Sequence, residues 1–200
     1  MKRFVRLATT ADAAGIHEIY APEVIETPIS FEVVPPGIEE MARRIRETTA
    51  TYPWLVCEDN GTILGYAYAG SHHSRAAYRW SIDVSVYLHR QARRQGLGRA
   101  LYTALLDILP RQGFYRAFAG ITLPNPASVG VHEAMGFKPV GVYHHAGFKH
   151  GAWYDVGWWE LPLQPLVAAP AEPVPLLEML DDAVITRALA RGSELLAARD

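Results

Sequence analysis

The stretch VYLHRQARRQGLGR, residues 86–99, decides the fold of this 200-residue chain. Residues 86–88 are apolar and read as the end of a strand, while residues 100–109 repeat apolar side chains at helical spacing. The first amides of a helix lack intrahelical partners and lie at the positive end of its dipole. Gly96 and Gly98 let a large anion approach the main chain, and Arg93, Arg94 and Arg99 add positive charge. The pattern predicts a phosphate or diphosphate cradle, with a plain basic turn at a helix start as the alternative.

Two common nucleotide motifs do not fit this stretch. A P-loop would continue with Gly-Lys-Ser/Thr, which is missing here. A dinucleotide fingerprint needs a third glycine where this chain has Leu101. Residues 93–98, Arg-Arg-Gln-Gly-Leu-Gly, resemble instead the acetyl-CoA loop of the GCN5-related N-acetyltransferases (GNAT), Arg/Gln-x-x-Gly-x-Gly/Ala.

The composition sets the limits of the remaining interpretation. Half of the residues are hydrophobic, which suffices for the core of one domain of ordinary size with an appendage. The net charge of −2 gives no overall bias towards nucleic acid or an anionic membrane. Neither a signal-peptide h-region nor a long apolar span is present, so we expect a cytoplasmic protein. Cys57 is the single cysteine, and its apolar neighbours favour packing over nucleophilic chemistry.

Periodicity and turn residues predict an α/β (α+β) domain over a mixed sheet. Expected strands cover residues 4–8, 54–58, 63–69, 82–88, 114–121, 140–143 and 153–160, and expected helices cover 13–20, 38–47, 100–109 and 126–135. Asp59-Asn60-Gly61 is a hairpin turn signal between two of these strands. We place the domain at residues 1–161.

The composition changes after this domain. Residues 162–175 contain five prolines and read as a linker or an extended strap. Residues 176–200 form a helical tail, whose helix over 176–198 would dock on the domain, dock on a partner subunit or stay mobile. The candidates for its apolar side are Leu177, Leu180, Val184, Leu189 and Leu195.

A wider resemblance extends from residue 4 to residue 161. Residues 52–56 (YPWLV), 67–70 (AYAG), 132–137 (HEAMGF), 146–151 (AGFKHG) and 155–157 (DVG) are similar to the phosphinothricin N-acetyltransferase branch of that family. The resemblance implies a mixed, mostly antiparallel sheet flanked by helices, with central strands that splay to admit acyl-CoA. It also implies acetyl transfer from acetyl-CoA, used as a co-substrate, to the amine of a small amino acid such as phosphinothricin or methionine sulfoximine. The implied assembly is a homodimer, and the charge balance predicts no nucleic-acid or membrane partner.

The same resemblance assigns residues to the acetyl-CoA site. Main-chain N–H groups of Val86, Tyr87 and Leu88 would polarise the thioester carbonyl. Asn125 would contact the cofactor, cap the following helix, or do both. The remaining cofactor-binding candidates form the glycine turn: Arg94, Gln95, Gly96, Leu97, Gly98 and Arg99.

Two residues are candidates for moving protons. Asp83 occupies the family position of a glutamate base, although a carboxyl with a pKa of about 4 needs burial to accept a proton from an amine. His132 lies seven residues after Asn125 (132 − 125 = 7), where many relatives carry a tyrosine near the thiol. A neutral imidazole, with a pKa of about 6.5, could serve there as base or acid. The alternatives are a solvated aspartate and a packing histidine.

Three residues are candidates for binding the acceptor. Arg75 offers a planar fork to a carboxylate or phosphinate, with a plain surface charge as its alternative. Tyr78 lies beside it in the sequence. Phe31, in the loop over residues 26–36, either lines a pocket or packs under the loop. His144, His145 and His150 show no zinc-ligand spacing, so we expect no metal.

Other functions with the same fold stay open at this point. The acceptor could be a protein N-terminus, a lysine or a polyamine, although the basic stretch 71–79 does not suit a polycation. Alternatively, the chain could be a catalytically impaired acyl-CoA-binding module, for which the aspartate at position 83 leaves room.

Overall fold

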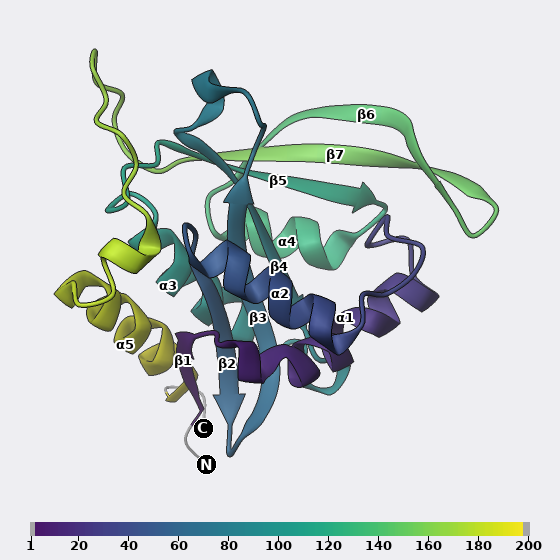
Figure 1. Ribbon diagram of the computed structural model, residues 1–200. Helices are drawn as coiled ribbons and strands as arrows, with labels where there is room; N and C mark the ends of the chain where they lie inside the picture. Colours follow the sequence, from purple (N-terminus) through teal and green to yellow (C-terminus); the bar gives the residue numbers. More distant parts are fainter. Residues whose placement is uncertain (1–2, 198–200) are drawn as a thin grey trace.

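A seven-stranded mixed sheet forms the centre of the protein, whose computed structural model describes residues 3–197 (Figure 1). The strands are β1 (Phe4–Leu7), β2 (Trp54–Asp59), β3 (Thr62–Ser71), β4 (Ser81–Leu88), β5 (Arg116–Leu123), β6 (Lys138–Lys149) and β7 (Ala152–Pro162). Their order is β1-β2-β3-β4-β5-β7-β6, and every pair is antiparallel except β4 with β5. The predicted mixed, mostly antiparallel sheet is therefore confirmed.

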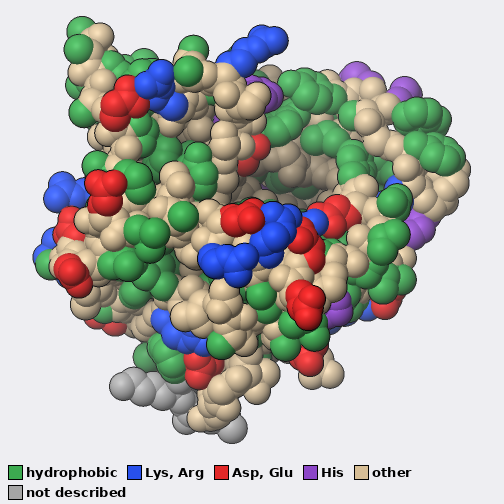
Figure 2. Space-filling view, in the orientation of Figure 1, with side chains coloured by type: hydrophobic (Ala, Val, Ile, Leu, Met, Phe, Trp, Pro, Cys, Tyr) green, Lys and Arg blue, Asp and Glu red, His purple; other side chains and the backbone are tan. Residues whose placement is uncertain are grey.

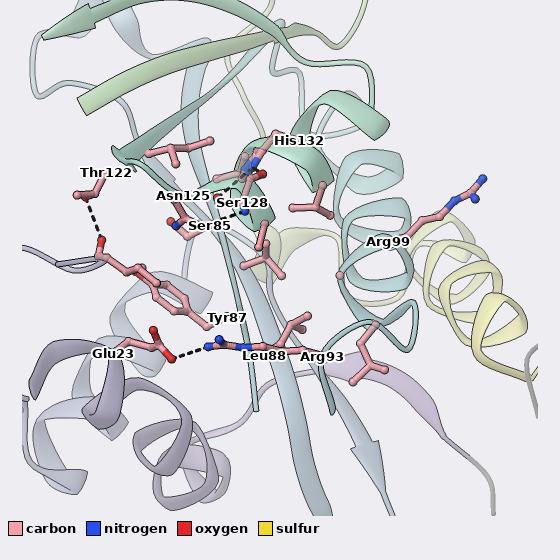
Figure 3. Close-up of a pocket in the computed structure, with 18 of the residues that line it drawn as sticks. Glu23, Ser85, Tyr87, Leu88, Arg93, Arg99, Thr122, Asn125, Ser128 and His132 are labelled. Carbon is pink, nitrogen blue, oxygen red and sulfur yellow. Dashed lines mark hydrogen bonds and ion pairs between the residues drawn. The ribbon is translucent and has the colours of Figure 1, made fainter. Parts of the chain in front are cut away.

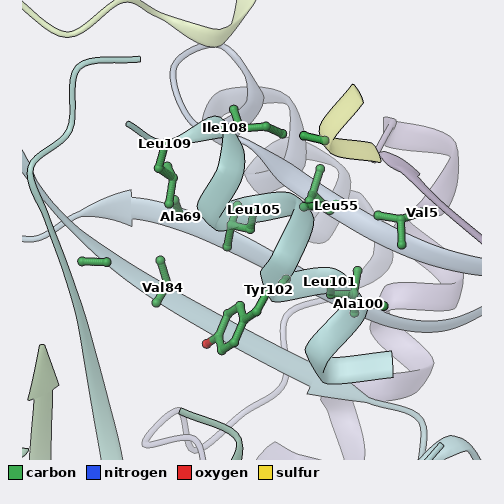
Figure 4. Packing of buried hydrophobic residues seen from close by; sticks show 14 of the residues in the cluster. Val5, Leu55, Ala69, Val84, Ala100, Leu101, Tyr102, Leu105, Ile108 and Leu109 are labelled. Carbon is green, nitrogen blue, oxygen red and sulfur yellow. The ribbon is translucent and has the colours of Figure 1, made fainter. Parts of the chain in front are cut away.

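Helices cover both faces of this sheet. They are α1 (Ala13–Glu26), α2 (Ile38–Thr49), α3 (Leu97–Ile108), α4 (Pro126–Ala134) and α5 (Ala183–Ala197), with short 3₁₀ turns at Thr10–Asp12, Ala76–Tyr78, Arg90–Ala92 and Leu176–Glu178. Successive strand residues face opposite sides, so Leu55 joins the core under α3 and α5, while Val56 joins the core under α1 and α2. Figure 4 shows the first core, where Tyr102 and Leu105 of α3 pack over the strands.

The central strands part soon after they meet. The parallel pairing of β4 with β5 covers only Ser81–Asp83 and Arg116–Phe118. Beyond Asp83, β4 continues to Leu88 paired with β3 alone. The edge of β4 that faces β5 therefore has main-chain groups without ladder partners, as the expected splay requires.

The β2–β3 hairpin agrees with the sequence prediction, whereas the β6–β7 hairpin differs from it. Asn60 and Gly61 have φ angles of 50° and 83°, the positive values that a tight β2–β3 turn needs. The strand expected at residues 140–143 is instead the twelve-residue β6. Its register against β7 shifts twice, so it lacks the alternating pattern that reveals a strand in the sequence.

The chain after β7 lies along the domain and ends in α5. Val174 N donates to Gln112 O at 2.8 Å, and Leu176 N donates to Thr51 O at 3.0 Å. Helix α5 packs on α3 and β1, and Val5 N donates to Ser193 Oγ at 2.9 Å. Its buried residues are Ile185, Ala188, Gly192 and Leu196. Of the apolar side expected for this helix, Leu177 and Leu180 are exposed and precede α5, and residues 198–200 lie outside the described part of the chain.

Candidate active site

A cavity of about 600 Å³ lies where β4 and β5 part (Figures 2 and 3). Its volume suits a small-molecule site. Strand β4, the turn before α3, strand β5 and helix α4 supply most of its wall, and Glu23 and Ile29 close it from the α1 side. Eleven of the residues singled out in the sequence line it: Val86, Tyr87, Leu88, Arg93, Arg94, Gly96, Leu97, Gly98, Arg99, Asn125 and His132.

The turn before α3 has the backbone geometry of an anion cradle. Arg94 and Gly96 both have positive φ angles, 64° and 86°, which fold the chain sharply into the helix. The first helical hydrogen bond joins Ala100 N to Gly96 O at 3.0 Å, so the preceding amides lack acceptors within the helix. A Cβ on Gly98 would lie 3.3 Å from Val131 Cγ2 of α4, on the cavity wall. These features fit a diphosphate held by main-chain donors.

Two side chains of this turn, those of Gln95 and Arg93, bind other parts of the chain. Gln95 does not line the cavity: its Nε2 donates to Gln91 O at 2.9 Å, and its Oε1 accepts from Arg3 Nη1 at 2.8 Å. Arg93 does line it, but its guanidinium is 2.6 Å from the buried carboxylate of Glu23 (Figure 3). The charge of Arg93, counted towards the cradle in the sequence, is therefore largely neutralised by a partner seventy residues away.

Helix α4 presents Asn125 and His132 to the cavity. Asn125 Oδ1 accepts from Ser128 N at 3.1 Å and so caps the helix, while the residue also lines the cavity. His132 Nδ1 is 2.7 Å from Ser128 O, and a carbonyl can only accept, so Nδ1 carries the hydrogen. Its Nε2 therefore accepts from the Tyr102 hydroxyl at 2.8 Å. Burial lowers the pKa of His132, which keeps the ring neutral with both nitrogens engaged.

Asp83 lies at the point where β4 and β5 part, paired in register with Phe118. Its Oδ1 is 2.7 Å from Nδ1 of His72, a residue just beyond the end of β3. Burial raises the pKa of the Asp83 carboxyl, against the lowering effect of the His72 hydrogen bond. The His72 ring stacks on Phe118 at 4.4 Å between centroids and meets the edge of Trp158 at 5.8 Å.

Sequence reasoning missed the role of His72 as the partner of Asp83. The signal was the antiparallel pairing of β3 with β4, which aligns Gly70 with Asp83 and leaves position 72 diagonal to 83 on the same face. The nine residues between the two strands hide this register in the sequence.

None of the three acceptor-binding candidates lines the cavity itself. Arg75 is exposed and precedes the 3₁₀ turn Ala76–Tyr78. The Tyr78 ring lies 4.7 Å from that of His73. The Phe31 ring covers Gly147 of β6, and its loop is held by a 2.6 Å hydrogen bond from the buried Lys149 Nζ to Ser30 O.

Comparison with known proteins identifies the class. The model of the acetyltransferase (GNAT) domain matches residues 5–158, and the chain belongs to this family. A phosphinothricin N-acetyltransferase from Streptomyces viridochromogenes is 39% identical over 170 residues, covering 85% of this chain and 92% of the relative. An L-methionine sulfoximine/L-methionine sulfone acetyltransferase from Salmonella typhimurium is 33% identical over 168 residues, covering 84% and 98%.

A solved structure agrees with these relatives. The GNAT superfamily phosphinothricin acetyltransferase from Sinorhizobium meliloti, in complex with AcCoA, superposes with a TM-score of 0.81 at 37% identity, covering 87% of this chain and 96% of that one. Helix α5 lies outside the matched residues 5–158.

Residues 3–197 contain neither a metal site nor a membrane-spanning helix. No group of three or more histidine, cysteine, aspartate or glutamate side chains gathers there as a metal site. In the same range no helix has the length and apolar character needed to cross a membrane.

Proposed function

We propose that the protein transfers the acetyl group of acetyl-CoA to the amine of a small amino acid of the phosphinothricin or methionine sulfoximine type. The observation that carries the proposal is one continuous cavity that runs from the glycine turn at α3 to the parting of β4 and β5 beside Asp83. The relatives named for these substrates support the acceptor class. The structure bound to AcCoA supports the donor.

The donor would be held at its diphosphate by the amides of residues 96–99, with Arg94, Arg99 and Asn125 beside them. Gln95 would act indirectly, by fastening the turn. The thioester carbonyl would accept hydrogen bonds from main-chain N–H groups of β4 between Val86 and Leu88, which lie on the cavity wall.

Proton removal from the acceptor ammonium belongs, in this proposal, to the Asp83 end of the cavity. A carboxyl whose pKa is raised by burial is better suited to proton chemistry near neutral pH than an ordinary aspartate. His132 would have to break a hydrogen bond before it could accept a proton. We therefore give His132 a positioning role on the cavity wall.

Arg75, Tyr78 and Phe31 would frame the acceptor. Arg75 lies on the segment that joins β3 to β4, next to the Asp83 end, and a guanidinium suits a carboxylate or phosphinate. Replacing Arg75 by alanine should raise the KM for the amino acid about tenfold and leave the KM for acetyl-CoA unchanged. An unchanged acceptor KM would remove Arg75 from the site.

The assembly, the location and the domain limits complete the proposal. Val140, Tyr143, Phe148 and Trp153 expose large apolar side chains along the β6–β7 hairpin, which supports a homodimer through this face. We place the reaction in the cytoplasm, where acetyl-CoA is available. Residues 1–161 would form the catalytic domain, 162–175 a strap and 176–200 a tail. Light scattering of Tyr143→Asp, against wild type, tests the dimer.

Thiol release from acetyl-CoA with a panel of acceptors tests the function. The panel should contain phosphinothricin, methionine sulfoximine, methionine sulfone, common amino acids, a polyamine and peptides with a free N-terminus or lysine. We expect turnover with the first group and little with the polyamine or the peptides. A protein that binds acetyl-CoA but acetylates none of them would be an acyl-CoA-binding module instead.

A further inference from the structure

His72 lies near the Asp83 end of the cavity and has no role in the proposed acetyl transfer as described so far. It lies just beyond β3, and only 13% of its side chain is exposed, against 37% for Asp83. Asp83 as a carboxylate can only accept, so His72 Nδ1 carries the hydrogen of their 2.7 Å bond. The neutral ring then has its lone pair on Nε2, for which no hydrogen-bond partner exists among residues 3–197.

The position of this pair follows from the two parting strands. Asp83 and Ser85 share one face of β4, and Phe118 and Gly120 share the same face of β5. Ser85 and Gly120 line the cavity. The His72–Asp83 pair lies one two-residue repeat further along β4 and β5, about 7 Å from these two residues and just outside the lining of the cavity. This distance is within the length of an amino acid.

Trp158 adds an independent observation at the same place. Its indole N–H is buried and has no hydrogen-bond partner within the described chain. The ring meets His72 edge-on at 5.8 Å, and a Cβ on Gly120 would lie 3.2 Å from it. A buried donor without an acceptor is costly, and an oxygen of the acceptor's acid group would satisfy it. Such a contact would hold an amino acid next to the imidazole.

We propose that His72 is the catalytic base of the acetyl transfer and that Asp83 is its positioning residue. This inference rests on the proposed function. Asp83 fixes the tautomer that leaves Nε2 basic and stabilises the imidazolium that forms, the arrangement by which a carboxylate supports a histidine base. The other titratable groups that face the ring are His73 beside it and Tyr78 from the 3₁₀ turn.

His72 Nε2 takes one proton from the acceptor ammonium, and the freed nitrogen lone pair forms a C–N bond to the thioester carbonyl carbon. The C–S bond breaks, and its electron pair leaves with sulfur. The second proton of the nitrogen passes to the coenzyme A thiolate, and the imidazolium releases its proton to solvent. Amide, free thiol and one proton are the products.

The test compares His72→Gln with His144→Gln, since His144 bonds Asp155 in the same way but on the exposed hairpin. Steady-state rates are measured from pH 6 to pH 10 with acetyl-CoA and methionine sulfoximine, together with acetyl-CoA affinity and Tm. His72→Gln should lower kcat about 10²-fold near neutral pH, and the deficit should shrink as the acceptor amine deprotonates on its own. His144→Gln should stay within about twofold of wild type.

Two further variants keep the test decisive. In His72→Ala, added imidazole should restore part of the rate, whereas Asp83→Ala should not respond to it, because its own imidazole is present but misplaced. Trp158→Phe should raise the acceptor KM with an unchanged pH profile.

The inference fails if His72→Gln keeps kcat within about threefold and the wild-type pH profile, or if imidazole rescues nothing in a folded His72→Ala protein. The proposed function fails separately, if the wild-type protein acetylates no amino acid.

Discussion

Two His–Asp pairs in this protein share their spacing and their chemistry but not their surroundings. His72 with Asp83 and His144 with Asp155 are each eleven residues apart and each joined from Nδ1 to a carboxylate oxygen, at 2.7 and 2.9 Å. The first histidine lies against Phe118 and Trp158, whereas the side chain of His144 is 71% exposed. Burial raises the pKa of Asp83, while hydrogen bonds, first from the His145 amide and then from His144, lower that of Asp155.

The difference shows what burial adds to the same two side chains. In water, an exposed ion pair contributes little, because solvent screens it and both side chains lose freedom. Beside the cavity, the hydrogen bond between His72 and Asp83 sets the tautomer of the His72 ring. It also holds in place the Asp83 carboxylate, whose charge is disfavoured by burial. The hairpin pair therefore serves as an internal reference for the cavity pair.

The largest expected effect comes from removing each carboxylate in turn. Asp83→Ala should lower kcat by up to about 10²-fold, because His72 loses the carboxylate that orients its ring and stabilises its imidazolium form. Asp155→Ala should change kcat by less than about twofold. Thiol-release rates at saturating acetyl-CoA measure both, and unaltered acetyl-CoA affinity confirms intact folding. Equal losses in the two variants would end the distinction between the pairs.

A second prediction uses His132, which is more deeply buried than His72 but has no free nitrogen. His132→Ala should cost about 1–3 kcal/mol of unfolding free energy, because the Tyr102 hydroxyl is left buried without its partner. Denaturant titration measures this. In the double variant with Tyr102→Phe the two losses should not add. Simple additivity would show that the hydrogen bond contributes nothing.

The smallest expected effects are changes of stability with pH, which have opposite signs for Asp83 and Asp155. The pKa of Asp83 is raised in the folded state, so its charge opposes folding above that pKa, and this cost disappears in acid. The pKa of Asp155 is lowered, so its charge supports folding above the unfolded value of about 3.9, and this gain is lost as the pH falls through the folded value.

Asp83→Asn should therefore raise Tm at neutral pH, and Asp155→Asn should lower it. The Asp83 difference should vanish towards a pH of about 3, where its carboxyl is largely protonated in both states. The Asp155 difference should persist there and disappear only below the lowered folded-state pKa of Asp155. Thermal unfolding of both variants and of wild type between about pH 3 and pH 7 measures these differences. Two Tm shifts of the same sign at pH 7 would contradict the opposite pKa shifts of Asp83 and Asp155.

The two halves of the cavity differed in how far the sequence could predict them. The half at the glycine turn is local: the strand end, two glycines and helix start within residues 86–99 predicted an anion cradle, which the family resemblance assigned to acetyl-CoA. The half at Asp83 is assembled from β3, β4, β5 and β7, whose register depends on the intervening loops. The family position was enough to name Asp83, whereas its hydrogen-bond partner His72 depends on the register of β3 against β4, which the sequence does not reveal.

The packed side of the tail helix was predicted only in part, for a related physical reason. The sequence favoured large side chains, including Leu177 and Leu180, as the packed side of the helix. Leu189 and Leu195 of the predicted set do pack against the core, but the buried residues of α5 are Ile185, Ala188, Gly192 and Leu196, two of which are small. A Cβ on Gly192 would lie 2.8 Å from Ala100 O, so the glycine lets α5 approach the α3 backbone closely. Residue size alone does not predict such close approach in a sequence.

The position of α5 also has a consequence for how the protein is made. It bridges β1, the first strand, and α3, which begins at the glycine turn. A nascent chain on the ribosome therefore covers this side of α3 only after residue 196 has emerged, since Leu196 is among the buried contacts. Until then the apolar side of α3 that faces α5 is exposed, so a chain truncated just after β7 would fold with that surface uncovered.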